Sequence, residues 1–333
     1  MLTHYPWQAS QWQHFMTMHT QHRLPHALLL TGNAGLGLHE FAKQIARHLL
    51  CFNTADECNP DESSQSYRLF DTGNHPDYRS IEPEEIGKQI KVTQIRELIE
   101  FLSLKSFTTK NKIVTLSPAE AMNRSTANAL LKTLEEPPEQ SMLILISHHP
   151  ERLPITIRSR CQKIEFQPAY DQQAINWLEE QKIESAYSSE LLLQLTGGAP
   201  LAVIEMLENE MLDERQQIVA DIDLILQDRA NPVELASRWE SLGCDLVIVW
   251  LMRFCQDIVR LKLMHDGADI VNQDLSEGLL EIAKSLDIAR IMRIYGFLQQ
   301  KYREATAQTN FNSLSLLEEI IIYWNNPKQV KQF

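Results

Sequence analysis

The sequence predicts an α/β domain with a parallel sheet in the first half of the chain, followed by domains made only of helices. Strand-like apolar runs alternate with helical stretches up to residue 166, and no strand-like alternation interrupts the helical pattern beyond it. Such alternation is typical of parallel β-α-β units, whose sheet is covered by helices on both faces. A chain of 333 residues is also long enough for two or three domains. We therefore expect domains at 1–166, 167–209 and 210–333, the second of them small and helical.

Hydrophobic periodicity places the elements of the α/β domain. Four apolar runs predict buried strands, at 26–31, 112–116, 142–146 and 163–166. Apolar residues that recur on one helical face predict helices over 38–50, 92–104 and 126–134. The polar stretch 53–77, with its Pro, Gly, Asn and Ser residues, predicts a loop or an insertion.

Beyond residue 167 the pattern is helical throughout. Short helices are predicted at 171–181, 188–196 and 199–210, and longer helical periodicity covers 246–264, 276–286 and 314–324. Large side chains at helical spacing in this region are expected in a helical core or in subunit contacts rather than around a cofactor. They are Trp250, Met252, Phe254, Met292, Tyr295 and Phe297.

The net charge of −13 is distributed unevenly along the chain. Residues 1–165 hold 17 basic and 18 acidic side chains, whereas residues 166–333 hold 14 and 26. Nucleic-acid binding requires an excess of Lys and Arg, so this composition argues against a protein that grips nucleic acid across its whole surface. Any surface that faces phosphate is expected in the first half.

The sequence favours a soluble, cytoplasmic protein without membrane association. Its opening lacks the basic and apolar regions of a signal peptide, and its longest apolar run, 246–252, is too short to span a bilayer. The five cysteines are odd in number and scattered, which favours reduced thiols over a disulfide framework.

A glycine-rich loop, Gly32-Asn-Ala-Gly35-Leu-Gly37, lies between the first predicted strand and the first predicted helix. Backbone N–H groups at such a position favour an anion. Loops that bind nucleoside triphosphates continue with Lys and then Ser or Thr, which contact the phosphates and Mg²⁺. Here Leu38 and His39 stand in those places, and neither supplies the missing chemistry. The loop by itself indicates either an altered phosphate loop or a plain turn.

A second part of a hydrolytic site is also missing. The strand 112–116 should end in acidic residues that hold Mg²⁺ and polarise the attacking water, but Ser117 and Pro118 follow it. Glu120 lies further on, in what should be the following turn. Because two independent parts of one site are absent, we do not expect this chain to hydrolyse ATP by that route.

The order of motifs resembles the bacterial clamp-loader branch of the AAA+ proteins. The motifs are the glycine loop, the run Asn128-Ala-Leu-Leu-Lys-Thr-Leu-Glu-Glu-Pro-Pro138, the strand with Ser147, and Ser159-Arg160-Cys161. They cover the first half strongly, and the second half matches in helical character and length. The resemblance implies a RecA-like parallel sheet, a small helical lid and a helical collar.

Three features narrow the resemblance to a non-hydrolysing subunit of the DNA polymerase III holoenzyme. They are the altered glycine loop, the opening Tyr5-Pro-Trp7 and the stretch His75-Pro-Asp77. This resemblance implies a subunit with no enzymatic activity of its own, in a complex where neighbouring subunits hydrolyse ATP.

The resemblance also implies an arginine finger. Clamp loaders are five-subunit arcs in which ATP lies at subunit interfaces, and an arginine of one subunit completes the site of its neighbour. That arginine belongs to the Ser-Arg-Cys element, so here it is expected to be Arg160. A fixed guanidinium stabilises charge on the transferring phosphoryl oxygens. Without the resemblance, Arg160 would be interpreted as a salt-bridged surface residue, and for Arg158 a structural or DNA-facing role is expected.

Two further positions correspond to nucleotide contacts of active relatives. Ser147 occupies the place of a hydroxyl that senses the γ-phosphate, and here a capping or turn role is expected for it. Pro200, in Gly197-Gly-Ala-Pro200, stands near the position of an arginine that faces the nucleotide in active members. The resemblance thus implies a third missing part of the nucleotide site.

Zinc is not expected. Subunits of this branch often carry four cysteines around a structural Zn²⁺, but the equivalent stretch here holds only Cys51 and Cys58. A closed zinc site needs four ligands, and neither His48 nor His75 has a recognised ligand spacing. We expect two free thiols. We also expect this chain to bind neither nucleotide nor Mg²⁺, since the resemblance places ATP and Mg²⁺ on the neighbouring subunit.

We therefore expect a catalytically inert clamp-loader subunit. Its expected partners are the gamma or tau and delta subunits, with the sliding clamp and primed DNA reached through the assembly. Three alternatives stay open: an ATPase in which His39, Ser117 or Glu120 replaces the lost groups, a subunit that binds nucleotide without hydrolysis, and an interaction subunit with no role at a neighbour's site.

Overall fold

Two compact units, Met1–Val203 and Ile204–Phe333, make up the chain in the computed structural model. The structure describes residues 4–51, 64–85, 87–107, 111–183, 185–264, 269–306 and 312–325. The first unit contains a parallel sheet with helices, and the second is helical, so the expected fold class is confirmed. The boundaries expected at residues 166 and 209, with a lid domain between them, stay a prediction.

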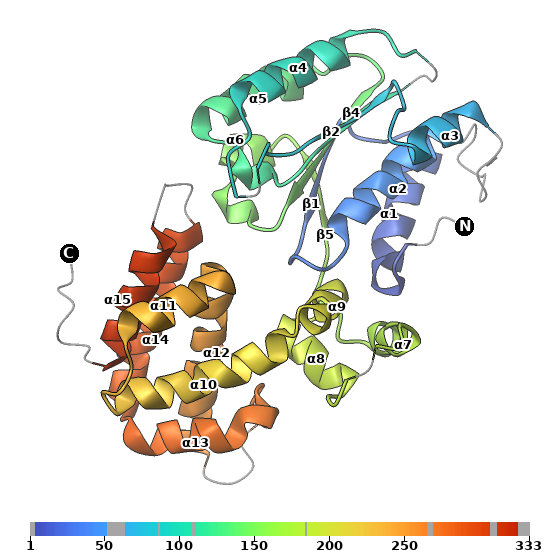
Figure 1. Ribbon diagram of the computed structural model, residues 1–333. Helices are drawn as coiled ribbons and strands as arrows, with labels where there is room; N and C mark the ends of the chain where they lie inside the picture. Colours follow the sequence, from blue (N-terminus) through green and yellow to red (C-terminus); the bar gives the residue numbers. More distant parts are fainter. Residues whose placement is uncertain are drawn as a thin grey trace. The chain divides into compact units, whose positions relative to one another are not determined.

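The sheet of the first unit has five parallel strands in the order β2-β3-β4-β1-β5 (Figure 1). The strands are β1 (Ala27–Thr31), β2 (Tyr78–Ile81), β3 (Lys112–Leu116), β4 (Ser141–Ser147) and β5 (Gln162–Glu165). Strands β1, β3, β4 and β5 correspond to the predicted runs. Strand β2 was not predicted, because this edge strand exposes Arg79 and Ser80 and so lacks an apolar run.

Helices cover both faces of the sheet (Figure 1). On one face, α4 and α5 pack against strand residues such as Leu29, Val114 and Leu143. On the other face lies α2, which contacts β1, β3 and β4. The α-helices of this unit are α1 (Ala9–Thr20), α2 (Leu38–Cys51), α3 (Gln65–Asp71), α4 (Val92–Ser103), α5 (Arg124–Glu135), α6 (Ile155–Arg158), α7 (Gln172–Glu180) and α8 (Ser189–Thr196), while α9 (Pro200–Glu208) crosses the boundary between the units.

Three of these helices were missed in the sequence: α1, α3 and α6, which has only four residues. Helix α1 buries only Phe15 fully, so its apolar periodicity is weak. Helix α3 falls inside the stretch 53–77, which was expected to be a loop or insertion, and that expectation is wrong for its residues. Short 3-10 turns complete the unit: η1 (Pro6–Gln8), η2 (Ala119–Ala121) and η3 (Pro150–Arg152).

The second unit packs its helices around a core that contains Trp239, Leu251 and Trp324. Among the large side chains expected in this region, Trp250 and Phe254 are buried, whereas Met292 is 53% exposed. The elements are α10 (Met211–Leu226), α11 (Pro232–Ser241), α12 (Cys244–Leu263), η4 (Gln273–Leu275), α13 (Ser276–Ser285), α14 (Ile288–Thr306) and α15 (Ser313–Asn325).

In the described part of the chain, no one helix has the length and apolar character needed to cross a membrane. The helices α8 and α9 pass that test only as a pair, and they are bent by 99° relative to each other.

A buried histidine pair joins α1 to α2. His19 Nδ1 lies 3.1 Å from His48 Nε2, and His48 is only 2% exposed. Trp12 and Phe15 meet the His48 ring edge to face. Burial, and then the charge of His19, lower the pKa of His48 from its ordinary value of 6.5 to about 4. Burial also lowers the pKa of His19. The fold therefore holds the pair neutral at neutral pH.

Acid is expected to destabilise the fold through His48. The pKa of His48 is lower in the folded chain than in the unfolded chain, so on acidification the unfolded chain takes up the proton first. The contribution of neutral His48 to folding stability is therefore complete above pH 6.5 and is lost as the pH falls toward 4. The expected loss is on the order of 2 kcal/mol. Urea unfolding at about pH 7.5 and about pH 4.5 measures it, with a smaller pH dependence expected for His48→Gln. His14→Gln, at an exposed position of α1, is the control, and equal pH dependence in both variants would contradict the assignment.

Candidate functional site

The glycine loop joins β1 to α2, and the residues that replace its Lys and its Ser or Thr are engaged within the chain. Leu38 begins α2 and is 2% exposed, so its side chain lies in the core. His39 Nε2 lies 3.9 Å from Glu82 Oε1. Gly35 and Gly37 have φ angles of +82° and +77°, which side chains disfavour.

The chain's own atoms pack directly against the loop glycines. A Cβ atom on Gly35 would lie 2.7 Å from both the Cβ and the backbone nitrogen of Ala202 in α9. Leu201, the preceding residue, donates its N–H to the Gly35 oxygen at 3.0 Å. A Cβ atom on Gly37 would lie 2.6 Å from the ring of Tyr5. Close packing therefore requires both glycines, whether or not a phosphate binds.

Gln8 ties the segment before α1 to the loop. It is fully buried, and its Nε2 donates to the backbone oxygens of Leu36 at 2.8 Å and Gly37 at 2.9 Å. Its Oε1 accepts the N–H of Tyr5 at 3.3 Å. Sequence reasoning missed this role, since the two partners lie 28 and 29 residues from Gln8.

Aromatic rings of Tyr5, Trp7 and Trp177 complete the cover over the glycine loop. Tyr5 stacks on Trp7 with ring centroids 4.8 Å apart, and Trp177 of α7 meets Trp7 edge to face at 5.0 Å. Trp7 Nε1 also donates to the Leu36 oxygen at 3.1 Å. Apolar Leu38 stands where loops that bind nucleoside triphosphates carry the phosphate-binding cation, and Tyr5, Trp7 and Gln8 pack against the loop.

The acidic residue after β3 has a structural partner. Glu120 lies in η2 and is 8% exposed. Its Oε1 accepts the backbone N–H groups of His148 at 2.9 Å and His149 at 3.1 Å. His148 Nδ1 in turn lies 3.0 Å from the Gly32 oxygen. Glu120 thus fixes the turn that follows β4.

Ser147 and Pro200 both lie close to the glycine loop. Ser147 ends β4 opposite Thr31, and its hydroxyl has no hydrogen-bond partner among the described residues, so the expected capping or turn role is wrong. Pro200 is buried and begins α9, directly before Leu201, which bonds the loop. Sequence reasoning alone could not locate these contacts.

Arg160 joins the two motifs that carry the family resemblance. It lies between α6 and β5, and its side chain is 34% exposed. Its Nη2 donates to Oε1 of Glu135 at 2.6 Å, and its Nη1 donates to the Thr156 oxygen at 2.9 Å. Glu135 is the last residue of α5. The neighbouring Arg158 is exposed, and no partner of its side chain is found among the described residues.

Arg160 and the glycine loop lie at opposite ends of two neighbouring parallel strands. Strands β1 and β5 are parallel neighbours, with Leu28 opposite Gln162 and Thr31 opposite Glu165. The loop follows the last residue of β1, whereas Arg160 precedes the first residue of β5. The length of one strand, which rises by about 3.3 Å per residue, therefore separates Arg160 from the loop of its own chain.

The Cys161 thiol and the Ser66 hydroxyl are not activated for catalysis. Burial raises the pKa of Cys161 to about 12, which keeps this thiol neutral. Ser66 Oγ lies 2.9 Å from His75 Nε2, a pair that sequence reasoning missed. Asp77 donates its backbone N–H to His75 Nδ1 at 3.1 Å. Since Nδ1 accepts this bond, Nε2 carries the proton, the opposite of what a general base requires.

The His75-Pro-Asp77 stretch instead organises the segment after α4. Asp77 is fully buried. Its carboxylate accepts the backbone N–H of Phe107 at 2.8 Å and the hydroxyl of Ser106 at 3.0 Å. Lys112 Nζ lies 4.0 Å from the same carboxylate. The motif therefore has an architectural role in this chain.

The two cysteines considered for zinc cannot be compared directly, because Cys58 lies outside the described residues. Cys51 ends α2, with its Sγ 4.0 Å from Ser66 Oγ. His48 pairs with His19, and His75 pairs with Ser66. Within the described ranges, no group of three or more His, Cys, Asp or Glu side chains is arranged to hold a metal ion. The absence of zinc stays a prediction.

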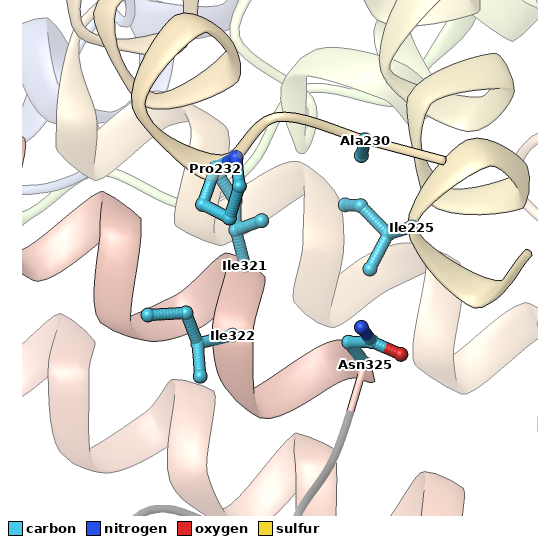
Figure 2. A pocket seen from close by; sticks show the side chains of 6 residues that line it. All are labelled: Ile225, Ala230, Pro232, Ile321, Ile322 and Asn325. Atoms are coloured by element: carbon cyan, nitrogen blue, oxygen red, sulfur yellow. The ribbon is translucent and has the colours of Figure 1, made fainter. Parts of the chain in front are cut away.

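Two cavities lie in the second unit. One, of about 170 Å³, is enclosed by side chains of α10, α11, α15 and the α10–α11 connection, and Figure 2 shows Asn325 as its polar residue. The other, of about 300 Å³, lies between α12 and α14 beside Met292 and Tyr295. Neither lining brings together acid, base and nucleophile groups.

The chain aligns along nearly its whole length with known proteins. A Pseudomonas aeruginosa protein named DNA polymerase III subunit delta' is 34% identical over 323 residues, covering 96% of this chain and 97% of that protein. Proteins of the same name from Escherichia coli and Bacillus subtilis are each 28% identical, covering 96% and 90% of this chain and 94% and 91% of their own lengths. A family model described as DNA polymerase III, delta subunit, matches residues 7–170, and one described as DNA polymerase III, delta subunit, C terminal, matches residues 209–326.

The parallel sheet, the altered glycine loop and the helical second unit define an AAA+ subunit of the clamp-loader class. The resemblance inferred from the motifs is confirmed by the matches to named relatives. The chain belongs to the DNA polymerase III subunit delta' family.

Packing at Gly35 gives a test of the closed loop. Gly35→Ala is expected to destabilise the fold by about 2–4 kcal/mol, because the new Cβ meets α9 and the φ angle is positive. Gly73→Ala is the matched control, with φ +73° and open space around the added atom. Urea unfolding should give a smaller loss for the control. Equal losses would mean that α9 does not close on the loop.

Proposed function

We propose that this chain is the catalytically inert subunit of a clamp loader and supplies Arg160 to ATP bound by a neighbouring gamma or tau subunit. In this proposal it also assembles with the delta subunit, and the complex loads the sliding clamp onto primed DNA in the cytoplasm. The chain binds no nucleotide, Mg²⁺ or Zn²⁺ of its own.

The position of Arg160 is the observation that carries this proposal. It lies before the amino-terminal end of β5, about one strand length away from the glycine loop of its own chain. It is therefore badly placed to act on a nucleotide in the same chain. It is one-third exposed, and a neighbouring subunit can reach it. A guanidinium directed at phosphoryl oxygens stabilises the charge of the transition state.

Inertness is supported by the way the expected substitutes for the lost groups are used. His39 faces Glu82, and the Glu120 carboxylate accepts two backbone N–H groups. The backbone N–H of Ser117 donates to Ile81, which anchors this residue in the sheet. To act in an atypical ATPase site, the His39 ring or the Glu120 carboxylate would have to leave these contacts.

Nucleotide binding without hydrolysis is disfavoured by the cover over the loop. Tyr5 and Gln8 contact Gly37, and Ala202 contacts Gly35, so the space beside both glycines is occupied by the chain itself. The buried Gln8 amide donates to two loop oxygens and so holds this segment against the loop.

Replacement of Arg160 is the direct test of the role in a neighbour's site. In a complex reconstituted with gamma and delta subunits, Arg160→Ala should assemble normally but lose clamp loading. At the ATP site that Arg160 serves, the rate of hydrolysis should fall by about 10³–10⁵. Arg158→Ala, at an exposed position two residues away, is the control and should keep the rate of ATP hydrolysis at that site. Unchanged ATP turnover with Arg160→Ala would refute the finger assignment.

The purified chain alone is expected to give no saturable binding of ATP or ADP in calorimetry with Mg²⁺ present. The physical reason is the apolar Leu38 together with the covered loop. An isolated gamma subunit serves as the positive control. Tight binding with turnover would favour the atypical ATPase, and tight ADP binding without turnover would favour nucleotide retention.

A further inference from the structure

We propose that Glu135 is a positioning residue that orients Arg160 for its role at a neighbour's ATP site. This inference rests on the proposed function and adds a residue to it. The shortest contact of the Arg160 guanidinium is the one from its Nη2 to Glu135 Oε1, at 2.6 Å.

The guanidinium is held from two elements. Glu135 ends α5 and engages Nη2, while the Thr156 oxygen of α6 engages Nη1 at 2.9 Å. A guanidinium has five N–H groups in a fixed plane, and these contacts leave donors on its other edge, including Nε, available to a phosphate. The side chain is one-third exposed, so those donors can meet another chain.

The position of Glu135 is fixed by its sequence. Glu136 is the C-cap of α5, and Pro137 and Pro138 follow it and prevent the helix from continuing. Helix α5 is anchored at its start by Asn123, whose side chain caps the N–H of Thr126. The carboxylate therefore projects from the end of a helix that is fixed at both ends.

The pair has little value for folding, because both side chains are substantially exposed and such ion pairs contribute weakly to stability. Its value lies in orientation. Arg has a long side chain with many rotamers, and holding one edge of the fork restricts them. Loss of the Glu135 carboxylate is therefore expected to lower the trans-stimulated ATPase rate by roughly tenfold, without changing assembly.

If Glu135 instead competed with ATP for Arg160, its removal would change the ATPase rate in the opposite direction. A carboxylate beside a phosphate repels it, so a Glu135 that competed with ATP for Arg160 would slow the reaction. Its removal would then raise the ATPase rate. The proposal predicts a fall.

The test compares variants in the complex reconstituted with gamma and delta subunits, sliding clamp and primed DNA. Glu135→Ala should lower ATP turnover at saturating ATP by roughly tenfold. Glu135→Gln keeps an oxygen acceptor and should retain most of the rate. Glu136→Ala is the matched control, because Glu136 is the exposed C-cap of α5 and has no contact with Arg160.

The double variant Glu135→Ala with Arg160→Ala distinguishes positioning from any other role. If Glu135 acts through Arg160, the double variant should be no slower than Arg160→Ala alone. A further loss would overturn the proposal, as would failed assembly, a raised rate, or an unchanged rate for Glu135→Ala. If Arg160→Ala itself has no effect, the proposed function fails; if Arg160→Ala is inactive and Glu135→Ala is normal, only this inference fails.

Discussion

Steric closure of the glycine loop is the constraint on which the rest of the first unit depends. Gly35 packs against Ala202 of α9, and Gly37 packs against the Tyr5 ring. These contacts fix the N-terminal segment and the start of α9 to the edge of the sheet where parallel strands normally bind a ligand. The glycine loop thereby holds these segments of the chain together.

With this edge closed, the chemistry that the chain can offer lies at the opposite edge. Arg160 stands before β5, and Glu135 and Thr156 hold its guanidinium while part of it stays exposed. One fold thus separates two functions of an AAA+ module. The glycine loop has a structural role in this chain, and Arg160, at the other end of the strands, keeps an accessible position.

Sequence reasoning succeeded where the evidence is local. Apolar runs predicted β1, β3 and β4, and the missing Lys at Leu38 could be read directly. It failed where contacts join distant residues or where burial is slight: β2 exposes its middle residues, and α1 fully buries only Phe15. The partners of Gln8 and Arg160, 28 and 25 residues away, follow from the packing of helices and have no signal in spacing.

The requirement for glycine at Gly35 and Gly37 has an evolutionary consequence. Any larger residue there collides with the chain itself, so purifying selection on folding alone preserves the spacing of a nucleotide-binding motif. The pattern is then required whether or not the loop binds a nucleotide. Genome surveys that count NTPases by their glycines would include such chains, and the residues immediately after the last glycine are the better discriminator.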